Sequence, residues 1–120
     1  GESKIDTDFT LRNYRSSVAA LYPTNLTPTP TFFHCSFDTR DNSAHAICQS
    51  AEKYTEDTIK ITLFNSGYGI QMYHEKNTTD QKYKTSVSFY LDLSDFTKLE
   101  NIIKESPKLE AFYDYLIEKK

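Results

Sequence analysis

Two cysteines and three histidines carry most of the reactive chemistry of this 120-residue chain. His34 and Cys35 are adjacent, and His45 precedes Cys48 by three residues. Cys35, His45 and Cys48, with His74 as a fourth ligand, are the ligand types that zinc prefers. However, the spacing matches no standard zinc motif, and neighbouring residues on a strand point to opposite faces. We therefore expect neither a bound metal nor a cofactor.

The cysteines admit three other interpretations. A minimal Cys/His hydrolase would pair Cys48 with His45, or Cys35 with His74, as nucleophile and base. No Gly-rich phosphate loop, G-x-S-x-G or H-E-x-x-H pattern accompanies them, so we do not expect an enzyme. A Cys35–Cys48 disulfide is the interpretation we favour, and it would place the protein in a secreted or periplasmic compartment. Two reduced, buried cysteines are the remaining alternative.

The composition is that of one folded domain spanning residues 1–120, in which we expect residues 1–7 to be flexible. Because the chain begins at Gly1 without Met, we expect a trimmed or mature protein. The net charge of −3 argues against nucleic-acid binding, which requires cations to neutralise phosphates. No apolar stretch is long enough for a membrane-spanning helix. Another protein is therefore the partner we expect.

The segment 82–93 alternates between apolar and polar residues almost without error. Val87, Phe89 and Leu91 fall on one face, whereas Ser86 and Ser88 fall on the other. Side chains alternate across a strand with period two, so this segment predicts a strand with one buried face. Such a pattern is typical of an antiparallel sheet that helices cover on one side.

The remaining elements predict an α+β fold with an antiparallel sheet of three to four strands, in the order α-β-α-β-β-β-α-α. Asp8 begins the first helix, and the Pro-rich segment 22–31 follows it. Strands are expected at 31–37, 58–64, 68–74 and 82–93. For residues 43–54 we favour a helix, with a short strand as the alternative. Gly67 supplies the positive φ of the hairpin loop 65–67. Ser94 caps the third helix, and Ser106 with Pro107 begins the fourth.

The periodicity of these elements also predicts which side chains form the core. They are the apolar residues at strand and helix positions that face the same layer. The expected core comprises Leu11, Val18, Phe33, Ile47, Ile61, Leu63, Ile70, Val87, Phe89, Leu91, Leu99, Ile103, Phe112 and Leu116.

The opposite, outer face of the sheet is the candidate binding surface. It combines aromatic and polar side chains, and aromatic rings supply large contact area at little entropic cost. With the adjoining tip at 75–81, the residues expected to contact a partner are Lys60, Phe64, Gln71, Tyr73 and Tyr90. The competing interpretation is that the first helix or the Pro-rich segment covers this face.

We therefore expect a small non-enzymatic protein-binding domain, exported from a bacterium and acting as an inhibitor or immunity-type protein. The alternative is a carrier of a small ligand, with a pocket between sheet and helices. That pocket would be lined by Tyr68, Met72 and Tyr83. The oligomeric state is left open.

Overall fold

The computed structural model describes residues 31–105 and 108–119. The described part contains the strands β1 (Thr31–Asp38), β2 (Ala44–Lys53), β3 (Ile59–Phe64) and β4 (Ser86–Leu91). Its helices are α2 (Ile70–Tyr73), α3 (Leu93–Glu105) and α4 (Leu109–Glu118). The predicted first helix, with Leu11 and Val18, and the Pro-rich segment lie outside the described residues.

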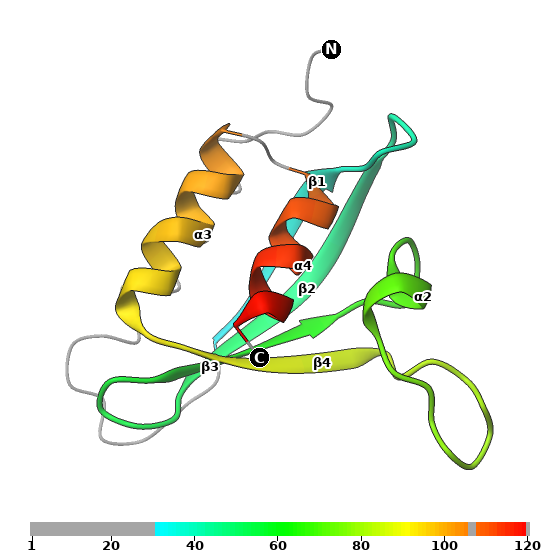
Figure 1. The fold of residues 1–120 in the computed structure, drawn as a ribbon, viewed down its shortest axis with the longest axis horizontal. Coiled ribbons are helices and arrows are strands. Elements are labelled where there is room, and N and C mark those ends of the chain that lie inside the picture. The colour runs from blue at the N-terminus through cyan, green and yellow to red at the C-terminus, as the bar shows by residue number, and fades with distance from the viewer. Residues whose placement is uncertain (1–30, 106–107, 120) are drawn as a thin grey trace.

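The four strands form one antiparallel sheet in the order β1-β2-β3-β4, in which each strand pairs with its neighbour in sequence. Helices α3 and α4 lie side by side on the same face of this sheet (Figure 1). The predicted α+β class and the four-stranded antiparallel sheet are therefore confirmed. We call the face beneath α3 and α4 the inner face and the opposite one the outer face.

Strand β4 follows the alternation of its sequence. Phe89 and Leu91 are buried on the inner face and Val87 is half-buried there, whereas Tyr90 is exposed on the outer face. Opposite them in β3, Ile59 and Ile61 are buried on the same inner face. Burying one row of apolar side chains per strand against helices is the main source of stability in such a layer.

The core lies between the inner face and the two long helices. Nine predicted core residues are buried: Ile47, Ile61, Leu63, Phe89, Leu91, Leu99, Ile103, Phe112 and Leu116. Ile70 and Val87 are half-buried. The side chain of Phe33 is not among those described. The ring of Phe37 in β1 packs against the ring of Phe112 in α4, with centroids 4.9 Å apart and planes inclined by 44°, which fixes the helix against the first strand.

The segment 43–54 is a strand, so the predicted helix there is wrong. Ile47 and Ala51 do share one face, as a helix would also place them, but Cys48 lies on the other face. Pairing with β1 on one side and β3 on the other supplies hydrogen bonds that outweigh local helix preference. The loop between β1 and β2 is closed by the Thr39 N–H, which donates to the Ser43 carbonyl at 3.0 Å.

The segment 68–74 does not return to the sheet, so the predicted strand there is also wrong. Gly69, rather than Gly67, has the positive φ, 92°, and the short helix α2 begins after it. Gly67 N–H donates to the Asn65 side-chain oxygen at 2.9 Å, which turns the chain out of the sheet. Strand β4 takes the place beside β3 that the predicted strand would have filled.

Helix α3 is capped two residues earlier than predicted. The Asp92 carboxylate, rather than Ser94, accepts from the Asp95 N–H at 3.0 Å, and Asp95 in turn accepts from the Asp92 N–H. This reciprocal arrangement satisfies two backbone donors at the helix start. Ser106 and Pro107, predicted to begin the last helix, lie outside the described residues.

Candidate functional site

The outer face carries four exposed aromatic rings arranged as two pairs. The first pair is Phe32 of β1 with Phe64 of β3, whose ring centroids are 6.5 Å apart. The second is Tyr54, just beyond β2, with Tyr90 of β4, at 4.7 Å. The exposed fraction is 64% for Phe32, 38% for Phe64, 63% for Tyr54 and 51% for Tyr90. We call these four residues the aromatic face.

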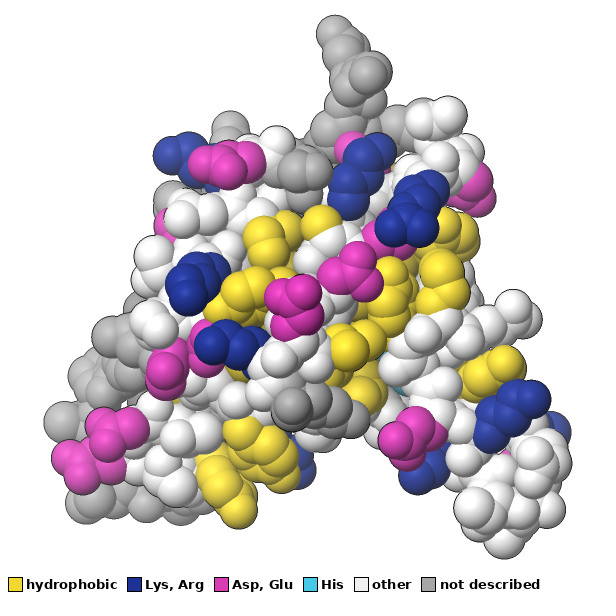
Figure 2. All heavy atoms as spheres, viewed as in Figure 1, with side chains coloured by type: hydrophobic (Ala, Val, Ile, Leu, Met, Phe, Trp, Pro, Cys, Tyr) yellow, Lys and Arg dark blue, Asp and Glu magenta, His cyan; other side chains and the backbone are white. Residues whose placement is uncertain are grey.

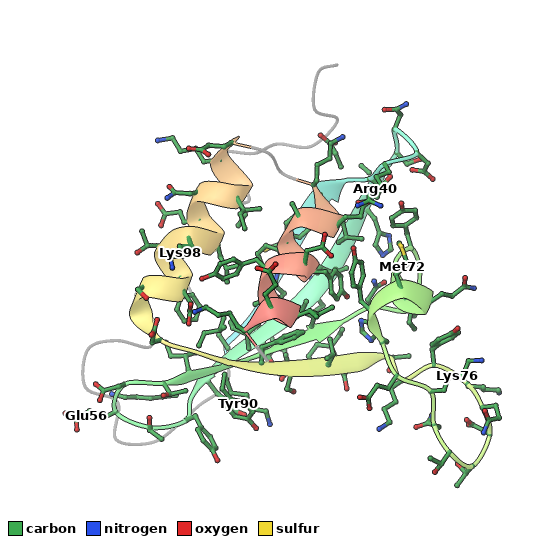
Figure 3. The ribbon with its side chains drawn as sticks, viewed as in Figure 1. Arg40, Glu56, Met72, Lys76, Tyr90 and Lys98 are labelled. Atoms are coloured by element: carbon green, nitrogen blue, oxygen red, sulfur yellow. The ribbon has the colours of Figure 1, made fainter. Side chains whose placement is uncertain are left out.

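The strand register explains why the two pairs form. Phe32 lies opposite Ser50, and Phe64 lies opposite Cys48, so the two rings reach each other diagonally across β2. Diagonal neighbours on one face of a sheet are within reach of aromatic side chains. Tyr90 lies on the side of β4 away from α3 and α4 (Figure 3).

A polar strip separates the two aromatic pairs. The Thr62 and Ser88 hydroxyls are hydrogen-bonded at 2.9 Å, and the Lys60 ammonium lies 3.7 Å from the Glu52 carboxylate. Ser50 at the centre is only 8% exposed. The face therefore presents two apolar contact areas around a centre whose side chains already have partners. Such a surface suits a partner that contributes its own apolar side chains rather than new charges.

Three of the predicted contact residues belong to this surface. Lys60 and Tyr90 are direct cross-strand partners, and Phe64 lies on the same face one row beyond Thr62. The sequence did not identify Tyr54, because residues 43–54 were assigned to a helix. Alternation with the predicted core residue Phe33 would place Phe32 outward, but its pairing with Phe64 depends on a register that the sequence does not reveal.

The other two predicted contact residues, Gln71 and Tyr73, are on α2 and not on the outer face. Tyr73 stacks on Tyr113 of α4 with ring centroids 4.5 Å apart and planes inclined by 5°. Burial, followed by the nearby Asp114 carboxylate, raises the pKa of Tyr73 to about 12. Tyr73 therefore belongs to the helix side of the molecule, and the prediction that it shares a face with Tyr90 is wrong.

The two cysteines are free and lie on opposite faces of the sheet. Cys35 is buried on the inner face, whereas Cys48 is half-buried on the outer face, opposite His34. Because the two side chains point to opposite sides, the structure does not support the predicted disulfide. Burial, with a smaller contribution from Cys48, raises the pKa of Cys35 to about 12. Cys35 is thus a protonated core thiol and lacks the thiolate that a nucleophile needs.

His45 and His74, the bases of the alternative hydrolase interpretation, both take part in a chain of hydrogen bonds between side chains. His74 is 6% exposed, and its Nδ1 lies 2.8 Å from the Lys84 carbonyl, which can only accept. Nδ1 therefore carries the proton, and Nε2 accepts from the Tyr113 hydroxyl at 2.8 Å. Burial lowers the pKa of His74, in agreement with a neutral ring.

The same series of hydrogen bonds continues from Tyr113 through Asn65 to His45. The Asn65 Nδ2 group donates to the Tyr113 hydroxyl at 3.3 Å and to the Tyr68 carbonyl at 2.7 Å. Its Oδ1 accepts from His45 Nε2 at 2.8 Å. These four side chains, His45, Asn65, Tyr113 and His74, form what we call the buried chain. Their donors and acceptors are matched to one another, so the buried chain joins β2, α2 and α4 rather than presenting a base to a substrate.

The three residues of the alternative carrier pocket come from the loop before α2, from α2 itself and from the tip that follows it. Tyr68 is half-buried and its hydroxyl donates to the Glu110 carboxylate at 3.1 Å. Met72 on α2 is 52% exposed (Figure 3). Tyr83 lies in the tip that connects α2 to β4, with the Lys76 ammonium 5.2 Å above its ring.

Within residues 31–105 and 108–119, no group of three or more His, Cys, Asp or Glu side chains is placed to hold a metal ion. None of the helices in these ranges is long and apolar enough to cross a membrane. Comparisons with protein-family models, with curated proteins and with solved structures found no significant match.

Proposed function

We propose that this chain is a non-enzymatic protein-binding domain of the inhibitor or immunity type, which holds its partner on the aromatic face. The proposal rests on one observation: two aromatic pairs, Phe32 with Phe64 and Tyr54 with Tyr90, are exposed on the outer face of the sheet. Exposed aromatic clusters on a rigid support are enriched where proteins bind other proteins. Figure 2 shows hydrophobic side chains that remain visible among the charged ones near the border of the sheet.

Folding does not require these rings to be exposed in pairs. The outer face contributes little to the core, which lies on the inner face, and a cross-strand aromatic pair stabilises a sheet by only about 0.2–1 kcal/mol. Polar side chains at the same positions would support the same sheet. Because a free energy of that size is small, binding gives a better reason for four exposed rings than stability does.

The compartment is left out of the proposal. Export was inferred from a disulfide, and both cysteines are free. Catalysis is also not part of the proposal, because the histidine hydrogen bonds are used within the buried chain and Cys35 is protonated.

The test is a comparison of two variants that remove equally exposed apolar side chains from opposite sides of the molecule. Tyr54→Ala/Tyr90→Ala removes one aromatic pair, and Met72→Ala removes a side chain of α2 that is 52% exposed, against 51% for Tyr90. The wild-type chain is immobilised to capture proteins from its source cells, and the captured protein is then purified and titrated against each variant by calorimetry.

We expect the tyrosine variant to bind about 30-fold or more weakly, because even one residue at the centre of an interface contributes about 2 kcal/mol or more. The Met72→Ala variant should bind within a factor of about two of wild type, in accord with energetically neutral positions. Equal affinity of both variants would place the partner elsewhere and refute the proposal. Thermal unfolding of each variant excludes misfolding as the cause.

The tyrosine variant also tests whether the aromatic face is free. The loss of unfolding free energy should stay within about 1 kcal/mol, the upper end for one cross-strand pair. A much larger loss would mean that these rings are part of a packed core, and the proposal would fail without any partner being identified.

A further inference from the structure

We propose that His74 is a pH-dependent latch: its neutral ring holds residues 66–85 against α4, and protonation of the ring releases them. We call residues 66–85, which connect β3 to β4 and include α2, the insert. Figure 1 shows the insert projecting beyond the border of the sheet. Every residue of the insert is described, and His74 is the only one that is buried. The single buried side chain of this segment is therefore one that can take up a proton.

The insert does not contain enough structure to hold its own conformation. Helix α2 has four residues, none of them buried, and so short a helix is not stable by itself in water. After it, the Lys84 N–H donates to the Glu75 carbonyl at 2.7 Å, which makes a short hairpin, and an isolated hairpin is only marginally stable. The conformation of the insert therefore depends on its contacts with α4. These are the stacking of Tyr73 on Tyr113, the hydrogen bond of Tyr68 to Glu110 and the hydrogen bond of His74 to Tyr113.

The backbone fixes the direction of the hydrogen bonds that lead to His74. The Asn65 side-chain oxygen accepts from the Gly67 N–H at 2.9 Å, and its Nδ2 donates to the Tyr68 carbonyl at 2.7 Å. Reversing this amide would place donor against donor and acceptor against acceptor. Nδ2 is therefore also the group that donates to the Tyr113 oxygen at 3.3 Å. The hydrogen of the Tyr113 hydroxyl is left for Nε2 of His74, 2.8 Å away.

A second proton on the His74 ring does not fit this arrangement. Nδ1 already carries a proton, because its partner is the Lys84 carbonyl, so the added proton goes to Nε2. The Tyr113 oxygen can accept from Nε2 only if its own hydrogen turns away. Asn65 Nδ2 at the same oxygen is also a donor, so that hydrogen has no acceptor among the described residues. A buried donor without a partner and a buried positive charge both favour opening of the insert.

The charged and titratable groups around the ring do not compensate a positive charge on it. They are Glu75 and Lys84 on the insert, Glu110 and Asp114 on α4, Arg40 in the β1–β2 loop and His45 on β2. Glu75 lies 3.8 Å from the Lys84 ammonium, and Glu110 accepts from the Tyr68 hydroxyl and the Arg40 N–H. Within residues 31–105 and 108–119, neither a hydrogen bond nor an ion pair joins a carboxylate to the ring. Burial lowers the pKa of His74, against a smaller opposing effect of the Lys84 carbonyl.

The pH range of the latch follows from this difference between the closed and the open insert. In the open insert the ring is in water, where the pKa of histidine is about 6.5. Above that pH both forms are neutral, and the opening equilibrium does not depend on pH. Below it the open form takes up the proton and the closed form resists it, so the opening equilibrium constant rises by up to about tenfold per pH unit. The insert is therefore held at pH 7 to 8 and is released progressively below about pH 6.5.

Amide hydrogen exchange of the full chain, followed by NMR from about pH 7.5 to about pH 5.5, tests the latch. The amides of His74 and Lys84, hydrogen-bonded to the Ile70 and Glu75 carbonyls, report on the insert. Their protection relative to an unstructured chain should fall by up to about tenfold per pH unit below about pH 6.5. Low concentrations of urea should not change it, because a local opening exposes little surface. The amides of β3, a strand paired on both sides, should remain more protected and sensitive to urea.

Two variants separate the latch from other effects of pH. His74→Gln removes the titrating ring, so the protection of the Lys84 amide should no longer depend on pH. His45→Gln is the matched control: it removes the other histidine of the buried chain but keeps a donor for Asn65, and it should respond like wild type. A pH-independent Lys84 amide in wild type overturns the proposal, and so does an unchanged response in His74→Gln. Equal protection and urea dependence of the insert and of β3 would mean global unfolding and would overturn it too. If His74→Gln does not fold, the wild-type ring decides: its resonances should titrate below pH 6.5, and titration at or above that value refutes the latch.

Discussion

Replacing Tyr113 by Phe tests whether the buried chain holds the helices to the sheet. The Tyr113 ring is fully buried, and its hydroxyl accepts from Asn65 and donates to His74. Burial raises the pKa of Tyr113 to about 12, so the hydroxyl keeps its proton at neutral pH. The substitution leaves the ring and its stacking on Tyr73 in place but removes both hydrogen bonds.

The expected loss of unfolding free energy follows from the two buried polar groups that lose their hydrogen-bond partner. His74 Nε2 loses its donor and Asn65 Nδ2 loses one acceptor, both in the protein interior. A buried polar group without its partner costs about 1–3 kcal/mol, so Tyr113→Phe should lower the free energy of unfolding by about 3 kcal/mol. Urea unfolding followed by circular dichroism at about pH 8, where histidine is neutral, measures this difference.

Tyr115→Phe is the matched control on the same helix. Its hydroxyl donates to the Asp95 carboxylate at 2.8 Å, but Tyr115 is only half-buried. Asp95 also keeps Lys119, whose ammonium lies 3.1 Å away. We expect a loss of about 1 kcal/mol or less. If Tyr113→Phe costs no more than Tyr115→Phe, the buried chain does not stabilise the fold as we infer.

Three further predictions concern single buried groups. Because burial lowers the pKa of His74, the unfolded chain takes up a proton below about pH 6.5 that the folded chain resists. The free energy of unfolding should therefore fall as the pH drops from about 7 to about 5, and more steeply in wild type than in His74→Gln; equal slopes would contradict this. Iodoacetamide should modify Cys48 in the native chain and Cys35 only after unfolding, as mass spectrometry can show; equal native rates would contradict the burial of Cys35. Neither polar atom of the fully buried Gln49 has a hydrogen-bond partner in the described structure, so Gln49→Met should raise the midpoint of urea unfolding, by about 1 kcal/mol or more in free energy; an unchanged midpoint would mean that this amide is satisfied.

Secondary structure was predicted correctly in the segments whose apolar residues follow a single period, of two residues for a strand or of three to four for a helix. Segment 82–93 alternates almost without error, and its inward residues Val87, Phe89 and Leu91 are those that face the helices. The two long C-terminal helices were likewise predicted from apolar residues three and four apart, and Leu99, Ile103, Phe112 and Leu116 are all buried. In these elements the local pattern and the tertiary environment favour the same structure.

The secondary structure predicted from the sequence was wrong for β2, where polar residues occupy inward positions. Strand β2 directs His45 and Gln49 to the inner face, so its apolar residues do not alternate, and Ile47, Cys48 and Ala51 imitate a helical stripe. Only pairing with β1 and β3 makes this segment a strand, and pairing between distant segments leaves no local signature. The position of His45 follows from its hydrogen bond to Asn65, twenty residues away.

The candidate site could be predicted only in part for a related reason. Alternation alone places Phe64 and Tyr90 outward, but whether two rings meet depends on the register between strands, because a shift of one residue moves every side chain to the other face. Tyr73 was misplaced because Gly69, with its φ of 92°, diverts the chain into α2 before a second hairpin strand can form. A glycine marks such a position without revealing which turn it makes.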